Sequence, residues 1–427
     1  MPDRYSQLTG IRYIAGNVLT LLIGTLVTQT LTTIALLITA RHLGVTGYGQ
    51  YAATYALLAQ TGVLLNFGLD TWLLRQGATS EMAMPRGLGN AAAIKLLLSL
   101  LWYPLVVTFA PLINPHVYPS TLVRAAALGV VCQAAGLSAQ SAFKAGLRNE
   151  ITSLLQVVGA TFFCVASLLL ASQDANVVQF AWGRTIAFAL VGLFGLYLAA
   201  QSFGLSPRLA DLRGVGRKSF PFLLSEALAV VYASIDLTIV AIMLGESASG
   251  FYAPAIAVVN ALFIIPNAVY TVMVPMITRA YTRDGGQIRY LSMGLILGMG
   301  VLGLAMSLTV FVLASPIIAF LYDVAFNASA DVLTILSAVL FFKPISYALA
   351  AILTAIDRQR DRVIVQAIVA FTNVAANLAI VQRYGVLGVA SVYVLTEALL
   401  CLGYAIFMFK GSRGFTFAYP RDKPPFL

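Results

Sequence analysis

Twelve long apolar segments run along the chain, and short stretches with charged residues, glycine or proline separate them. Each segment approaches or exceeds the about 20 residues with which an α-helix crosses a bilayer. Backbone inside lipid must satisfy its own hydrogen bonds, so each segment should be helical. In the first half the predicted helices cover 14–39, 49–72, 88–111, 120–143, 151–171 and 177–202. In the second half they cover 219–244, 250–276, 289–315, 331–355, 363–383 and 386–409.

The composition supports a membrane protein. The chain is 60% hydrophobic and 10% charged, with a mean hydropathy of +0.89, whereas soluble domains hold about 25% charged residues. A net charge of +10 would suggest nucleic acid in a soluble protein. Here the basic residues lie mostly between apolar segments, so we expect no nucleic-acid partner. The fold class predicted is an all-α integral membrane protein.

The basic residues also predict the topology. With the N-terminus in the cytoplasm, 20 of the 26 Lys and Arg residues fall in cytoplasmic segments, two in outer loops and four within spans. This bias follows the positive-inside rule and predicts that both termini are cytoplasmic. The uncharged run 13–40 lacks a clear cleavage site and is interpreted as a retained first span rather than a signal peptide.

A ten-residue pattern, L-G-x-x-x-x-G-x-Y-A, occurs at 43–52 and again at 244–253. Gln156 and Gln366 show a similar correspondence at an offset of 210. Such matches in the same membrane orientation predict a parallel repeat about an axis along the membrane normal. The longest polar connection, 204–218, predicts two six-helix lobes, 1–210 and 211–427.

Both copies of the pattern are expected in outer loops, where glycines turn the chain tightly. The tyrosine of each copy is expected at the start of the next helix, where its ring would face the lipid headgroups. We interpret the pattern as a hinge or anchor rather than as the place where substrate binds.

Ionisable residues within the spans are the main functional candidates, because each costs at least about 2.5–3.5 kcal/mol near mid-bilayer. The candidate substrate-binding residues of a cavity are Lys343, Lys95, Arg184, Gln156, Gln366, Asn373 and Asn377. The candidates for ion coupling or ion pairing are Asp236, Glu397 and Glu226.

Structural roles remain open for each candidate. Lys343 and Glu397 lie at similar depth and either form an ion pair or place the lysine toward pyrophosphate or an acidic sugar. Lys95 either faces the cavity or pairs with Glu226. Arg184 either lines the cavity or pairs with Asp236. The amides either contact sugar hydroxyls or make interhelical hydrogen bonds.

Other chemistries are not expected. The two histidines have no metal-ligand spacing around them, and the three cysteines lie inside apolar segments, where packing explains them. No P-loop, no good major-facilitator motif and no nucleophile–base constellation is found. We therefore expect neither an enzyme nor a cofactor.

Several motifs carry a resemblance to a known family, and they occur in order over most of the chain: Asn17, Ala40–Gly44, Gly47–Tyr51, Asn66–Asp70, Ser234–Asp236, Ile265–Asn267, Val274–Pro275 and Tyr384–Ala390. With these motifs the chain resembles the polysaccharide-transporter branch (Wzx-type oligosaccharide flippases) of the MOP superfamily, which also holds the MATE exporters.

The resemblance implies two MATE-like lobes in a V around a central cavity. It also implies alternating-access movement of undecaprenyl-pyrophosphate-linked oligosaccharide from the cytoplasmic to the periplasmic leaflet of a bacterial inner membrane. The product would serve O-antigen, capsule or exopolysaccharide synthesis, with a polysaccharide polymerase and a chain-length regulator as partners. The alternatives are a cation-coupled MATE-type small-molecule exporter and a scaffold without transport; the lack of a carboxylate in 13–40 argues against the exporter.

Overall fold

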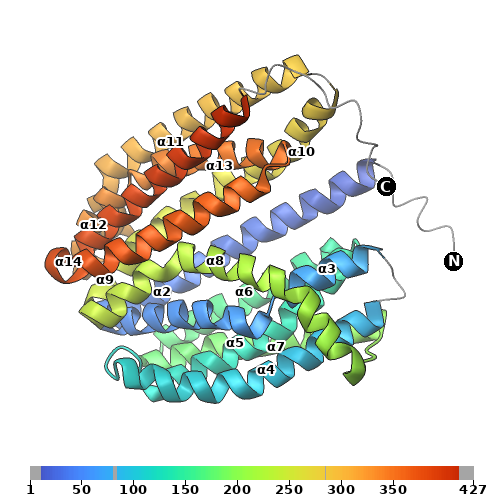
Figure 1. Cartoon of the computed structure of the whole chain (residues 1–427). Helices are drawn as coiled ribbons and strands as arrows, with labels where there is room; N and C mark the ends of the chain where they lie inside the picture. Colours follow the sequence, from blue (N-terminus) through green and yellow to red (C-terminus); the bar gives the residue numbers. More distant parts are fainter. Residues whose placement is uncertain (1–10, 80–83, 284, 413–427) are drawn as a thin grey trace. The chain divides into compact units, whose positions relative to one another are not determined.

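The computed structural model describes residues 11–79, 84–283 and 285–412, and the regular elements within them are helices (Figure 1). The first group of helices is α2 (Ile11–Asn66), α3 (Leu69–Thr79), α4 (Met84–Ile113), α5 (Ser120–Ala145), α6 (Asn149–Ala171), α7 (Val177–Phe203), η2 (Leu209–Asp211) and α8 (Leu212–Leu244). The second is α9 (Glu246–Leu262), α10 (Ile264–Arg283), α11 (Gly285–Tyr322), η3 (Val324–Phe326), α12 (Ala328–Leu336), α13 (Val339–Ala355) and α14 (Gln359–Ser412).

Within these described ranges, nine helical stretches are long and apolar enough to cross a membrane. Two of them, α2 and α14, bend at glycines with positive φ, Gly44 (φ 66°) and Gly385 (φ 59°). Each bent helix therefore covers two predicted spans. The apolar part of α8, Ser234–Leu244, is a shorter segment. The all-α multi-pass architecture is confirmed, and the helices are compatible with the twelve predicted spans.

The repeated pattern turns between two helices at its first glycine, as predicted, but its other residues are helical rather than an extended outer loop, which corrects the sequence-based expectation. Helix α2 continues through 43–52 with its break at Gly44, and α9 begins directly after Gly245 (φ 91°). Tyr51 and Tyr252 are each 1% exposed, so they do not face the headgroups. Their hydroxyls instead meet charged groups inside the helix bundle, as described below.

The second predicted span ends earlier than expected. Helix α2 stops at Asn66, and Phe67 (φ 49°) and Gly68 (φ 67°) turn the chain into α3. A Cβ on Gly68 would lie 2.5 Å from the backbone nitrogen of Leu223 in α8. This turn needs glycine both for its left-handed φ and for the close approach of α8.

The chain forms two compact units, Met1–Pro254 with Ile318–Ala328, and Ala255–Ile317 with Ser329–Leu427. Helix α8 belongs to the first unit because it packs against α2, α3 and α4. The predicted lobe boundary at 210/211 precedes α8, and the division into two six-helix lobes stays a prediction.

In the first unit, α5 and α7 pack most extensively, with α4 and α6 beside them (Figure 1). A Cβ on Gly136 of α5 would lie 2.9 Å from the Cα of Gly192 in α7. Small residues allow such close contact of helices in a membrane. This contact brings the polar residues of α5 next to those of α7.

Candidate functional site

Arg184, the eighth residue of α7, lies among aromatic rings. Its guanidinium carbon is 4.0 Å from the ring centroid of Tyr55, 5.2 Å from that of Phe188 and 5.4 Å from that of Phe163. Cation–π contacts of this kind each contribute about 0.5–2 kcal/mol, more when water is excluded. The rings therefore hold a positive charge within a membrane-spanning helix.

No carboxylate within residues 11–79, 84–283 and 285–412 forms a salt bridge with Arg184. Its Nη1 donates a hydrogen bond to the hydroxyl of Tyr51 at 3.4 Å. Its Nε is buried and has no hydrogen-bond partner among the described residues. The guanidinium thus keeps both its charge and donor capacity for an anionic group.

Two adjoining cavities of about 300 and 340 Å³ meet at this arginine. Arg184, Gln133 and Leu137 line both of them. The smaller also includes Tyr55 and Asn66, and the larger lies among α2, α5, α6 and α7. The polar residues that line only the larger cavity are Thr25, Thr28, Gln29, Thr32, Gln140 and Gln156. We call the two cavities together the Arg184 site.

Hydrogen-bonding capacity remains along these walls. Thr28 Oγ1 and Asn66 Oδ1 are buried with no hydrogen-bond partner among the described residues. Gln156 donates from Nε2 to Gln140 Oε1 at 2.9 Å, which leaves the other amide atoms of this pair available to a ligand. Amides and hydroxyls of this kind bind sugar hydroxyls, and a guanidinium binds phosphate or carboxylate through paired donors.

Sequence reasoning named Arg184 and Gln156, and the structure places both in one site. It missed Gln29, Gln133 and Gln140, although each is an uncharged polar residue inside an apolar segment. A polar residue within an apolar segment was the sequence pattern that could have identified these three glutamines as cavity residues. The aromatic surroundings of Arg184 come from three different helices and had no sequence signal.

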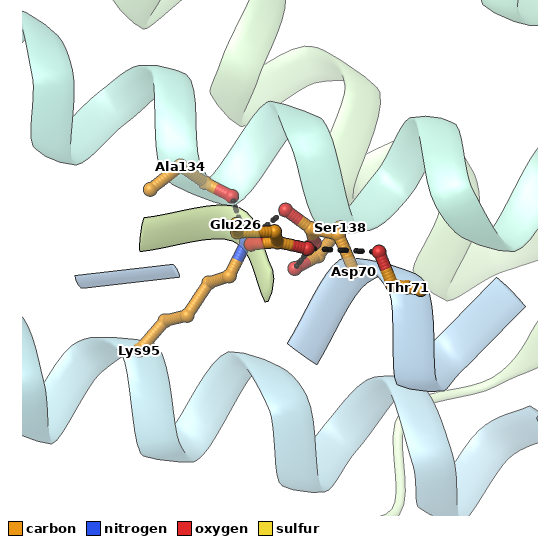
Figure 2. Close-up of polar contacts among 6 residues, drawn as sticks. All are labelled: Asp70, Thr71, Lys95, Ala134, Ser138 and Glu226. Atoms are coloured by element: carbon orange, nitrogen blue, oxygen red, sulfur yellow. Dashed lines mark hydrogen bonds and ion pairs between the residues drawn. The ribbon is translucent and has the colours of Figure 1, made fainter. Parts of the chain in front are cut away.

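Lys95 of α4 is the centre of a second polar cluster (Figure 2). Its Nζ donates to Asp70 Oδ1 at 2.7 Å and to the carbonyl oxygen of Ala134 at 2.8 Å. Ser138 donates to the same carboxylate at 3.0 Å. Lys95 is 3% exposed, and its partners account for its charge and donors. This geometry favours a structural role for Lys95.

Glu226 of α8 lies beside this cluster but pairs differently from the alternative considered above. Thr71 donates to Glu226 Oε1 at 2.8 Å, whereas the ion-pair partner of Lys95 is Asp70. Thr71, the residue that follows Asp70, thereby links α3 to α8, as Figure 2 shows.

We expect Lys95→Met to lower stability by up to about 3 kcal/mol, since it leaves the Asp70 carboxylate, whose side chain is only 18% exposed, without its cation. The double variant Lys95→Met/Asp70→Asn should recover most of that loss. Thermal unfolding in detergent checks both variants. Equal stability of Lys95→Met and the parent protein would contradict a structural pair.

Lys343 and Glu397, two candidates of the second compact unit, pair with each other. Lys343 Nζ is hydrogen-bonded and ion-paired to Glu397 Oε1, with the rings of Phe263 and Tyr393 near its ammonium group. The ion pair foreseen as one alternative is therefore present. Glu397 is fully buried.

The amide candidates of this unit behave in a similar way. Asn377 donates to Asn373 Oδ1 at 3.1 Å, and Asn373 donates to Thr396 Oγ1 at 3.4 Å. Both asparagines are fully buried. The first bond joins neighbouring turns of the same arm of α14, whereas the second joins the two arms of α14 on either side of the bend at Gly385. Gln366 is half-buried in α14.

Asp236 and Arg184 each meet a tyrosine of the repeated pattern. Tyr252 donates to Asp236 Oδ2 at 3.5 Å, and Arg184 donates to Tyr51. The pairing of Arg184 with Asp236, one of the two alternatives, is not what the structure has. Tyr51 and Tyr252 occupy equivalent positions of the two copies, so each copy contacts one intramembrane charge.

The fold matches solved structures of membrane transporters. The lipid II flippase MurJ, in an inward closed conformation, matches with a TM-score of 0.76 and 14% identity over 91% of this chain and 87% of that chain. A multidrug-resistance MATE transporter of the MOP superfamily matches at 0.77 and 15% identity, over 92% of this chain and 96% of that one. A single-residue mutant of the MATE transporter VcmN of Vibrio cholerae matches with a TM-score of 0.64 and 16% identity, over 93% of this chain and 96% of that chain.

The sequence comparisons give the family. No curated protein matches the sequence. A model of the family described as polysaccharide biosynthesis protein matches residues 14–281, more than half of the chain. The chain therefore belongs to the polysaccharide biosynthesis protein family, and it shares the fold of the MurJ and MATE transporters.

Proposed function

We propose that this protein moves a lipid-linked oligosaccharide from the cytoplasmic to the outer leaflet of a bacterial inner membrane, for the synthesis of a surface polysaccharide. The observation that carries the proposal is the Arg184 site, where a guanidinium without a carboxylate partner among the described residues adjoins walls of amides and hydroxyls. The substrate is an isoprenoid carrier, undecaprenol, joined through pyrophosphate to a short glycan.

The chemistry of this substrate matches the site. Its charged, hydroxyl-rich head must cross about 30 Å of hydrocarbon, which lipid alone makes very costly. A cation in a water-poor cavity offsets the lost hydration of phosphate or of an acidic sugar through charge-assisted hydrogen bonds. The carrier chain stays in the bilayer, and alternating exposure of a fixed site to the two sides moves the head across.

The charge of the Arg184 site separates this proposal from cation export. A site for cationic drugs needs a carboxylate or an open aromatic cage. Here the guanidinium of Arg184 already makes the cation–π contacts with the rings of Tyr55, Phe163 and Phe188. Association with a polysaccharide polymerase and a chain-length regulator belongs to the same proposal, because the translocated unit is their substrate.

Reconstituted vesicles test the proposal directly. The purified protein is placed in liposomes with a fluorescent undecaprenyl-pyrophosphoryl oligosaccharide, and an impermeant glycosidase reports the fraction reaching the other leaflet. We expect translocation well above that of protein-free liposomes. A pyrophosphate-free prenyl glycoside provides the control, and it should move more slowly.

A protein that inserts correctly but moves no lipid-linked glycan would contradict the proposal. Movement of a cationic drug across the membrane of these vesicles, driven by an ion gradient, would then favour the exporter. Capture of a polymerase without any translocation would favour the scaffold.

A further inference from the structure

The connection between α7 and α8 is fixed to the first turns of α4. The backbone N–H of Ser206 donates to the carbonyl oxygen of Pro85 at 3.0 Å. The backbone N–H of Arg208 donates to Asn90 Oδ1 at 2.7 Å, and Asn90 is 3% exposed. Because these bonds hold the chain directly before η2 and α8, the start of α8 has a set position in the first compact unit.

The start of α8 has a buried face and an exposed face. Val215, Ser219 and Leu223 follow one another at steps of four and are at most 7% exposed. Exposed residues follow one another at steps of four, three and four, which places them along one line of the helix. These residues are Arg213, Arg217, Phe220 and Leu224. We call this line the α8 stripe.

The α8 stripe changes from basic to apolar along the helix. Arg213 and Arg217 come first, and Phe220 and Leu224, which are 48% and 52% exposed, follow them. At about 1.5 Å per residue the stripe is about 16 Å long. Basic and apolar side chains on one exposed face are typical of helices that lie where lipid headgroups meet hydrocarbon. The stripe therefore has the chemistry of a lipid, with a charged end and an apolar end.

The basic residues of this region lack acidic partners. Residues 204–224 contain four basic side chains and one acidic side chain, that of Asp211. In the part of the chain that the structure describes, none of the four forms a salt bridge. Arg213 and Arg217 are four residues apart and repel each other, and basic residues near a helix N-terminus oppose the helix dipole. An anion over the stripe would offset both effects.

We propose that the α8 stripe binds anionic phospholipids of the surrounding membrane. The lipid phosphate lies at Arg213 and Arg217, and an acyl chain lies along Phe220 and Leu224. Guanidinium groups donate paired hydrogen bonds to phosphate oxygens, and basic residues at an anionic membrane surface attract its lipids. In the topology that the basic residues predict, these lipids belong to the cytoplasmic leaflet.

Two observations favour a membrane phospholipid over other anionic partners. An acidic protein surface would match the arginines but would leave Phe220 and Leu224 without an apolar partner, whereas a lipid covers both ends of the stripe. No described residue of α8 lines either cavity of the Arg184 site. The stripe is thus separate from the proposed substrate site, and this inference does not depend on the proposed function.

A fluorescent label beside the stripe tests the proposal. In a variant with Cys132, Cys164 and Cys401 replaced by alanine, Leu224→Cys carries a bimane label. The protein is placed in vesicles of equal parts phosphatidylcholine and phosphatidylglycerol, with bromine on the acyl chains of one lipid or the other. Quenching should show phosphatidylglycerol enriched at least about fivefold beside the label. Salt at about 1 M shortens the Debye length to about 3 Å and should lower this enrichment.

Two double variants make the result specific. Arg213→Gln/Arg217→Gln should lower the enrichment to about twofold or less, since the stripe loses both of its charges. Both arginines are exposed, so the protein should still fold. Arg124→Gln/Arg383→Gln is the matched control, because it removes the same charge from two exposed arginines outside the stripe and should keep the enrichment of the parent.

Thermal unfolding in detergent gives a second readout. Added phosphatidylglycerol should raise the unfolding temperature of the parent by about 2 °C, because a ligand that binds the folded protein stabilises it. Added phosphatidylcholine should not raise it, and Arg213→Gln/Arg217→Gln should lose the increase. An increase with undecaprenyl diphosphate but not with phosphatidylglycerol would overturn the proposal and assign the stripe to the substrate head.

The label decides between the remaining occupants. Equal quenching by the two brominated lipids in the parent would overturn the proposal and favour an acidic protein as the partner of the arginines. An equal loss of enrichment in both double variants would show an effect of net charge and not of the stripe. Neither measurement involves a glycan, so a failure of translocation would contradict the proposed function and leave this result unchanged.

Discussion

Replacing Arg184 with glutamine is expected to slow translocation of lipid-linked glycan by about 10- to 100-fold, because the loss removes charge-assisted hydrogen bonds worth about 1.5–3 kcal/mol. The protein should still fold and insert. No carboxylate of the described chain forms a salt bridge with this arginine, so its removal leaves no buried anion without a partner. The vesicle assay measures the rate, and thermal unfolding in detergent measures the stability.

Two further variants make this result specific. Arg184→Lys should retain part of the rate, since it keeps the charge but loses the paired donors. Arg124→Gln is the matched control, because Arg124 is an exposed arginine in the first turns of α5 and lines neither cavity. A normal rate with Arg184→Gln would contradict the assignment of the anion to this site.

Replacing Lys343 with methionine is expected to destabilise the protein by about 3–5 kcal/mol, because Glu397 is fully buried and would lose its cation. The cost of removing one partner of this pair is larger than the stability gained by forming the pair. Forming a buried ion pair contributes little net stability, since desolvation of both groups offsets their attraction, but removing one partner leaves a charge in a low-dielectric interior. Thermal unfolding and limited proteolysis of the purified variant measure the loss.

The double variant Lys343→Met/Glu397→Leu distinguishes a structural pair from a functional one. If the pair is structural, the double variant should approach the parent in stability and retain translocation. Recovered stability without translocation would instead assign the pair to substrate or ion coupling. Single and double variants equally unstable would contradict direct coupling between the two side chains.

The helices were predictable because lipid imposes a strict rule on the chain. Apolar length and internal backbone hydrogen bonding mark each span in the sequence. The ends were less certain, because Phe67 and Gly68 stop α2 inside a continuous apolar segment. The requirement for that turn is the packing of Gly68 on α8, a contact distant in sequence.

The site was only partly predictable. A charge within a span predicts a partner or a cavity, and this rule made Arg184, Lys95 and Lys343 candidates without showing which of them lines a cavity. Packing separated them: Lys95 and Lys343 meet carboxylates from other helices, and Arg184 meets aromatic rings. The sequence pattern does not show which faces of the helices pack against one another.

The sequence by itself determined that this chain is a multi-pass helical membrane protein of the polysaccharide biosynthesis family with an internal repeat, since burial in lipid and duplication both leave local patterns. Only the tertiary structure decided which charges are neutralised, that Arg184 adjoins two polar cavities, and that the two copies of the repeat meet through Gly49 and Gly250. These properties depend on contacts between residues far apart in the chain, which form when helices pack.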